Sequence, residues 1–255
     1  MAIMQFSHAN GFPASSYSYV FELLPELDVH HINKMGYGAF PLKRNLHNFA
    51  DELLDHIQRH HQEPVIGVGH STGAVVTLLA AVKQPHLFKR VILLDPVLFR
   101  FTKRLVIDMA RLVGMGDRMG PTRKALTRRT HFGDHDEARQ YFGGKGFFRN
   151  FDPRCFEDYV QHGLMPAASG AGLELAISAQ LEADIFRSVL TRLPRKLAPV
   201  PTTLVHATHH PLLEPADIDW LKRHGNGIDF VPFEGGHMFP LEQPQATADL
   251  IRRCM

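Results

Sequence analysis

Gly69-His70-Ser71-Thr72-Gly73 directly follows the apolar run Pro64-Val65-Ile66-Gly67-Val68. The run is typical of a buried strand, and residues 74–82 after the quintet are typical of an apolar helix. A chain that passes from strand to helix this quickly must turn sharply, and the two glycines leave room for backbone that a Cβ would block. Ser71 then stands at the tip of the turn, beside the free N–H groups of the first helical turn. The stretch predicts a strand-turn-helix unit with Ser71 as a candidate nucleophile.

Strand-like runs alternate with helix-like segments along most of the chain. This alternation predicts an α/β fold with a mostly parallel sheet of about six strands flanked by helices. The expected strands are residues 3–7, 28–33, 65–68, 90–94, 202–207 and 228–233, and the clearest expected helices are 19–24, 49–57 and 74–82.

The alternation stops between residues 99 and 193. This segment has helical patches at 105–110 and 173–186 but no convincing strand. We therefore expect an α/β core from 1–98 and 194–255, with 99–193 as a helical cap insertion over the sheet edge where such proteins bind ligands. The glycine-rich stretch at 143–146 is not typical of a phosphate loop, because no strand precedes it and no Ser or Thr follows its lysine.

Composition excludes several classes of protein. With 255 residues, a net charge of +2 and a pI near 8.6, the whole chain does not resemble a nucleic-acid-binding protein. Residues 100–149 nevertheless contain twelve Lys or Arg against five acids. Such a run is more often a solvated helical face than a site for an anion, although an anionic substrate stays open as an alternative.

The expected location is the cytoplasm. The two cysteines, Cys155 and Cys254, are far apart in sequence and suit a reducing compartment. The N-terminal residues lack the pattern of a secretory signal, and no run approaches the roughly 20 apolar residues of a membrane span. The sequence does not indicate an oligomeric state.

An active serine needs a histidine that takes its proton, and that histidine needs a carboxylate to orient it. His237 is the strongest of the seventeen histidines, because it follows the last expected strand and the two glycines Gly235 and Gly236. The adjacent histidine pairs elsewhere are poor metal sites, since neighbours in a strand point to opposite faces. We expect neither a metal nor a cofactor.

The acid is less obvious. In hydrolases of this arrangement it usually follows the penultimate strand, where this chain has His210. Asp95 follows the strand next to that of Ser71, so its side chain is expected at the same sheet edge as His237. An ordinary strand-ending turn at Asp95-Pro96 is the alternative. Glu214 and Asp217 are the fallback acids.

The chain resembles the α/β-hydrolase superfamily from about Ile3 to Ile251, and is similar to its compact, capped serine esterases and lipases. The motifs that carry the resemblance are His8-Ala9-Asn10-Gly11-Phe12-Pro13, Gly69-His70-Ser71-Thr72-Gly73, Leu94-Asp95-Pro96 and Gly235-Gly236-His237. Together they are specific for the fold and much less so for the substrate.

The resemblance implies further roles. The family's His-Gly-X-Pro loop supplies an oxyanion N–H from X, which falls on Phe12, and the second N–H falls on Thr72. Asn10 replaces the family's histidine and leaves that backbone donor in place. An acid at the position of Asp95 is a variant known in lipase-like members. The two strands that often begin the family's sheet have no counterpart here, which implies a shortened sheet.

The leading hypothesis is therefore a serine hydrolase that cleaves a small-molecule carboxylic ester through an acyl-enzyme intermediate. Thioester, amide, lactone or carbon-carbon bond hydrolysis on the same residues is an alternative. A non-catalytic ligand-binding protein of this fold is another, which His210 keeps open. An apolar acyl part would suit the phenylalanines of the cap, although many of them can simply pack it: Phe132, Phe142, Phe147, Phe148, Phe151 and Phe156.

Overall fold

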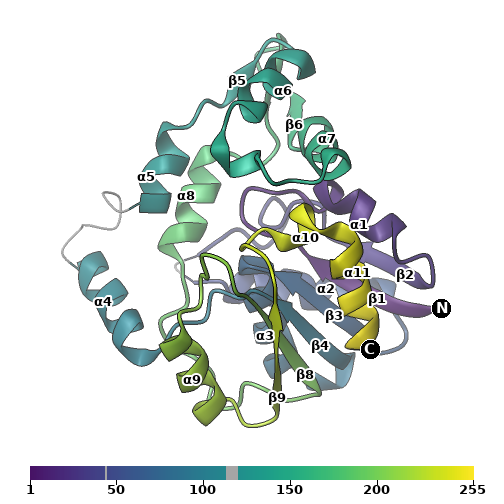
Figure 1. Cartoon of the computed structure of the whole chain (residues 1–255), viewed down its shortest axis with the longest axis vertical. Coiled ribbons are helices and arrows are strands. Elements are labelled where there is room, and N and C mark those ends of the chain that lie inside the picture. Colours follow the sequence, from purple (N-terminus) through teal and green to yellow (C-terminus); the bar gives the residue numbers. More distant parts are fainter. Residues whose placement is uncertain (44, 113–119) are drawn as a thin grey trace.

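The computed structural model describes residues 1–43, 45–112 and 120–255. Its centre is a six-stranded sheet in the order β2-β1-β3-β4-β8-β9, in which every neighbouring pair is parallel (Figure 1). The strands are β1 (Ala2–Ser7), β2 (Leu27–His31), β3 (Val65–His70), β4 (Phe88–Leu94), β8 (Thr202–Ala207) and β9 (Ile228–Phe233). The predicted α/β fold and its six-stranded parallel sheet are confirmed.

Helices cover both faces of this sheet because its central strands are apolar on both sides. In β4, Ile92 and Leu94 pack on one face, and Val91 and Leu93 pack on the other. The first face is covered by α1 (Ser18–Glu22) and α11 (Pro244–Arg253), and the second by α2 (His47–His60), α3 (Thr72–Lys83) and α9 (Pro215–His224) (Figure 1). Among the described helices, none combines the length and the apolar character needed to cross a membrane.

Strand order brings the candidate site residues together. β3 lies between β1 and β4, and β8 lies beside β4. Since all these strands are parallel, their carboxyl ends share one edge of the sheet. Ser71, Asp95 and the loops after β1 and β8 therefore meet at this edge, although they are far apart in sequence.

The sequence predicted a helical segment between β4 and β8. The structure shows that this segment also contains strands. It contains α4 (Phe101–Leu112), α5 (Gly120–Thr127), α6 (His135–Gly143), α7 (Pro153–His162) and α8 (Ala179–Arg187). It also contains a second, three-stranded antiparallel sheet of β5 (His131–Phe132), β7 (Leu173–Leu175) and β6 (Leu164–Pro166). The helix expected at 173–186 thus begins as a strand. Strands of two or three residues are too short to show alternation in sequence.

The division into an α/β core and a cap insertion at residues 99–193 remains a prediction, and "cap" is used only as a name for residues 99–193. The basic segment at 100–149 includes residues 113–119, which lie outside the described part of the chain. Within that part, several of its basic side chains pair with acids: Arg128 with Glu182, Arg129 with Glu137, and Arg139 with Glu157.

The turn after β3 depends on two close backbone approaches. A Cβ on Gly69 would lie 2.5 Å from the Gly73 carbonyl oxygen, and a Cβ on Gly73 would overlap the carbonyl oxygens of Ser7 and His8. These contacts involve backbone atoms, which cannot rotate away as a side chain can. The glycines therefore let α3 start directly against the end of β1.

We expect Gly73→Ala to lower the free energy of unfolding by about 3 kcal/mol or to prevent folding, because the new methyl group overlaps two backbone carbonyls. Urea denaturation of the purified variant measures this effect. Gly146→Ala is the control, because no described heavy atom lies within 4 Å of its added Cβ. Equal stability of the two variants would contradict this account of the turn.

Candidate active site

Ser71 occupies a strained turn between β3 and α3. Its φ of 56° and ψ of −116° belong to a region that L-residues rarely adopt. Its N–H donates to the Leu94 carbonyl at 2.9 Å, which ties the turn to the end of β4. The residue is only 6% exposed. The strain and this tie hold the side chain at the sheet edge.

Ser71, His237 and Asp95 form one chain of hydrogen-bonded side chains. His237 Nε2 lies 3.0 Å from Ser71 Oγ, and His237 Nδ1 lies 2.5 Å from Asp95 Oδ2. With the Nδ1 proton donated to Asp95, Nε2 can accept the hydroxyl proton of Ser71. The structure therefore brings together the three residues that the sequence singled out.

Asp95 is fully buried and held by two backbone contacts besides the imidazole. Its Oδ1 accepts from the Ala207 N–H at 3.0 Å, and its own N–H donates to Val205 at 2.8 Å. Its φ of 44° turns the chain sharply after β4. Asp95 thus bridges the ends of β4 and β8 and faces His237.

The fallback acids lie in a different network. Glu214 pairs with Arg100 at 2.8 Å, and the buried Asp217 accepts from the Arg100 backbone N–H at 3.0 Å. Lys103 also contacts both carboxylates. They fasten the start of α9 to the start of α4. Asp95, and not these acids, contacts the imidazole of His237.

The two predicted oxyanion donors differ in their present partners. Thr72 is the first residue of α3, so its N–H has no acceptor within the helix. The N–H of Phe12 lies 3.2 Å from the Ala9 carbonyl, closing a turn in which Gly11 has a φ of 78°. To donate to an oxyanion, the Phe12 N–H has to share or break its 3.2 Å hydrogen bond to the Ala9 carbonyl.

Sequence analysis missed a buried hydrogen-bond chain through His70, the residue before the serine. His70 Nε2 lies 2.9 Å from the His237 carbonyl, so it donates there, and Nδ1 accepts from the Tyr17 hydroxyl at 2.7 Å. The Tyr17 oxygen in turn lies 3.4 Å from the Ala9 N–H. The chain joins the loop of His237 to the turn of Phe12. The position of His70 within the quintet was the one signal of it.

A partly buried ion pair within the cap lies beside the same turn and was also missed. Arg128 donates to Glu182 at 2.6 Å and to the Tyr159 hydroxyl at 2.9 Å. The Glu182 carbonyl accepts from Asn10 Nδ2 at 3.0 Å, and the Phe12 ring centroid lies 4.8 Å from that of Tyr159. Cap and turn therefore share one polar and one aromatic contact.

Most of the cap phenylalanines pack this junction. Phe142, Phe148 and Phe151 join the cluster of Phe12 and Tyr159. Phe132 and Phe142 are almost completely buried, whereas Phe147 is 54% exposed. The cluster explains why these residues do not reveal the length of an acyl chain.

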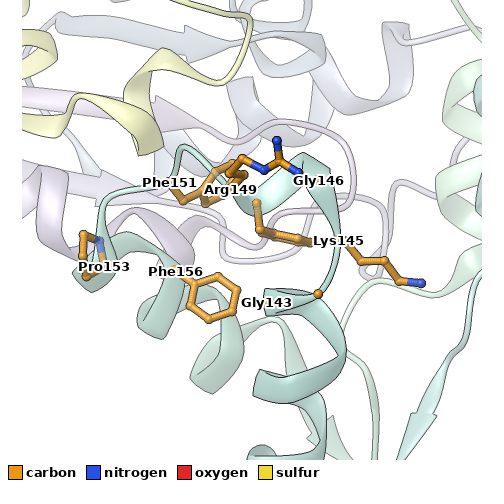
Figure 2. Close-up of a pocket in the computed structure, with 9 residues that line it drawn as sticks. Gly143, Lys145, Gly146, Arg149, Phe151, Pro153 and Phe156 are labelled. Carbon is orange, nitrogen blue, oxygen red and sulfur yellow. The ribbon is translucent and has the colours of Figure 1, made fainter.

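Two hollows lie near the junction of cap and core. One, of about 570 Å³, has His237 in its wall together with His209, His210 and residues of the cap. The other, of about 390 Å³, lies between the end of α6 and the start of α7, with Gly143, Lys145 and Phe156 in its lining (Figure 2). The Lys145 ammonium there lies 4.3 Å from the centroid of the Tyr141 ring. Within the described part of the chain, no three His, Cys, Asp or Glu side chains are placed to hold a metal ion.

Comparison with known proteins agrees with this geometry. Residues 6–250 match the family described as the alpha/beta hydrolase family. The chain belongs to the alpha/beta hydrolase family. It is 26% identical over 246 residues to lipase LipV of Mycobacterium tuberculosis, covering 90% of this chain and 84% of LipV.

Solved structures of alpha/beta hydrolases share the fold at lower identity. E-2-(acetamidomethylene)succinate hydrolase superposes with a TM-score of 0.80 at 19% identity, covering 99% of this chain and 90% of that one. The thioesterase domain from the curacin biosynthetic pathway superposes with a TM-score of 0.70 at 19% identity, covering 98% and 90%. At these identities the likeness shows the fold alone.

We expect stability to fall steeply as the pH drops below about 6.5. Burial lowers the pKa of His70 to about 3 and that of His8 to about 4, so both stay neutral in the folded chain. The unfolded chain then binds the extra protons as the pH falls, and each histidine removes up to about 1.4 kcal/mol per pH unit. Urea unfolding at a series of pH values measures the slope. His8→Gln should flatten it, whereas the same change at the exposed His86 should not.

We expect Tyr17→Phe to lower the free energy of unfolding by about 1–3 kcal/mol, because His70 Nδ1 and the Ala9 N–H lose their buried partner. Tyr141→Phe is the matched control. Within the described part of the chain the Tyr141 hydroxyl makes no hydrogen bond, and phenylalanine keeps the contacts of the ring. Thermal and urea unfolding of the two variants compare them directly. A Tyr17→Phe protein as stable as the control would show that the chain through His70 contributes nothing.

Proposed function

We propose that this alpha/beta hydrolase is a serine esterase that cleaves small-molecule carboxylic esters through an acyl-enzyme intermediate. Ser71 is the nucleophile, His237 the base and Asp95 the acid. The observation that carries the proposal is the continuous chain from Asp95 through His237 to Ser71, with contacts of 2.5 and 3.0 Å. The name of the relative LipV supports an ester as the bond that is cleaved.

The first half-reaction acylates the serine. His237 Nε2 takes the Ser71 proton as Oγ attacks the ester carbonyl carbon, and the carbonyl oxygen becomes an oxyanion that the N–H groups of Thr72 and Phe12 receive. His237 then gives its proton to the alcohol oxygen as the carbon-oxygen bond breaks. The alcohol leaves, and the acyl group stays on Ser71.

The second half-reaction repeats these roles with water. His237 takes a proton from the water as its oxygen attacks the acyl carbon, and the proton returns to Ser71 Oγ as the acid leaves. Asp95 keeps the imidazole in the required tautomer and stabilises the imidazolium that forms in each half. A buried carboxylate suits this role, because the surrounding medium screens its charge little.

Hydrolysis of thioesters, amides or lactones would use the same residues and stays an alternative within the same site. A non-catalytic binding protein is less favoured, because Asp95 supplies the carboxylate that His210 cannot. We further propose that residues 99–193 act as the cap of the site. The two cysteines are free and buried, which supports the expected cytoplasmic location.

We expect a fluorophosphonate to label the wild-type protein once, to fail on Ser71→Ala and to react slowly with Asp95→Asn. Intact-mass spectrometry measures the label. Turnover of p-nitrophenyl butyrate by Asp95→Asn should fall by roughly three to four orders of magnitude, because the amide favours the wrong tautomer of His237.

Glu214→Gln is the matched control, because it also removes a carboxylate beyond a strand end but one that pairs with Arg100. It should keep its turnover within a few-fold of wild type. A folded wild-type protein that takes no label would overturn the proposed function.

A further inference from the structure

The hollow beside His237 is built from both the core and the cap. Its volume is about 570 Å³, and it lies between the loop after β8, the loop after β9 and the segment before α7. Its polar lining residues besides His237 are His209, His210, Glu242, Gln243 and Asn150, and its apolar side chains are Phe147 and Met238. These residues form a wall that is open to solvent and that also contains His237 of the proposed triad.

The position of His237 decides which part of an ester this hollow can receive. In the proposed reaction, Nε2 of His237 delivers the proton to the alcohol oxygen, so the alcohol has to leave past this imidazole. The carbonyl oxygen points instead to the N–H groups of Thr72 and Phe12, and neither residue lines the hollow. A hollow that contains the imidazole of His237 but neither oxyanion donor fits the leaving alcohol better than the acyl group.

The polar groups of this wall can form hydrogen bonds with hydroxyl groups of a substrate. Asn150 offers both a donor and an acceptor, and the imidazoles of His209 and His210 offer ring nitrogens as further hydrogen-bonding groups. Gln243 Nε2 already donates to the Glu234 carbonyl at 2.9 Å, and the Glu242 carboxylate lies against Gly236. An alkyl chain would displace water from these groups without replacing its hydrogen bonds. A carboxylate on the alcohol part of the substrate would be repelled by the carboxylate of Glu242.

The wall is also held in place. The Thr208 N–H donates to Phe233 at 3.0 Å and the His209 N–H donates to Gly235 at 2.9 Å, which joins the loop after β8 to the loop that carries His237. His210 has a φ of 47°, a costly conformation for a residue with a Cβ. Such strain persists only where surrounding contacts maintain it, and here it lies beside the proposed base.

We propose that this hollow is the leaving-group site and that it selects esters of polar alcohols with several hydroxyl groups over esters of alkyl alcohols. The inference rests on the proposed esterase function and adds the class of alcohol. Asn150 and His210 are its specificity-determining residues, the first from the cap and the second from the core.

The test compares two esters with the same acyl group and the same carbon skeleton in the alcohol, 1-monobutyrin and propyl butyrate. We expect the wild-type kcat/KM for monobutyrin to exceed that for propyl butyrate by about tenfold or more, equivalent to one or two hydrogen bonds. Asn150→Ala and His210→Gly should each reduce this ratio by about three- to tenfold. Glycine keeps the left-handed backbone at 210 while removing the imidazole.

Lys145→Ala is the control, because this lysine lies on the same cap segment but lines the other hollow. Its ratio should equal that of wild type. A wild-type protein that takes the fluorophosphonate label but shows a ratio near one would overturn the inference and leave the esterase function standing. A high ratio that neither Asn150→Ala nor His210→Gly changes would overturn the assignment to this hollow. Absence of both label and turnover would overturn the esterase function itself.

Discussion

The buried carboxylate of Asp95 is the constraint on which the site depends. A charge removed from water has to be compensated, and two groups from two other segments converge on it: the Ala207 N–H and the His237 imidazole. The geometry of β8, of the loop after β9 and of β4 is therefore coupled. Ser71 joins the same arrangement through its bond to Leu94.

The segments around Ser71 are joined to one another by direct contacts and do not act as independent loops. Gly73 lets α3 start against β1, and the chain from Ala9 through Tyr17 and His70 reaches His237. Asn10 donates to the Glu182 carbonyl and so joins the cap to the turn after β1. These contacts are buried or partly buried, where unpaired groups are costly. Displacement of the cap would therefore also disturb the turn that carries the Phe12 N–H.

Local patterns predicted the sheet because most of its strands contain a short apolar or β-branched run, such as Val91-Ile92-Leu93-Leu94 in β4. They also singled out Ser71, Asp95 and His237, since each follows a strand end within a short motif. The pairing of Tyr17 with His70, 53 residues apart, and of Asn10 with Glu182, 172 residues apart, leaves no local pattern. The three short strands of the cap were not predicted for a different reason. Their two or three residues are too few to show a hydrophobic period, and only their pairing defines them as strands.

The position of Asp95 directly after β4 has a consequence for how proteins of this design diversify. The loop between β8 and α9 carries no member of the proposed triad, so selection on the acid does not restrict its sequence. Insertions and substitutions there can accumulate while the chain from Asp95 to Ser71 stays intact. An acid at Asp95 thus keeps the residues proposed for the chemistry apart from the loop proposed to set the alcohol preference.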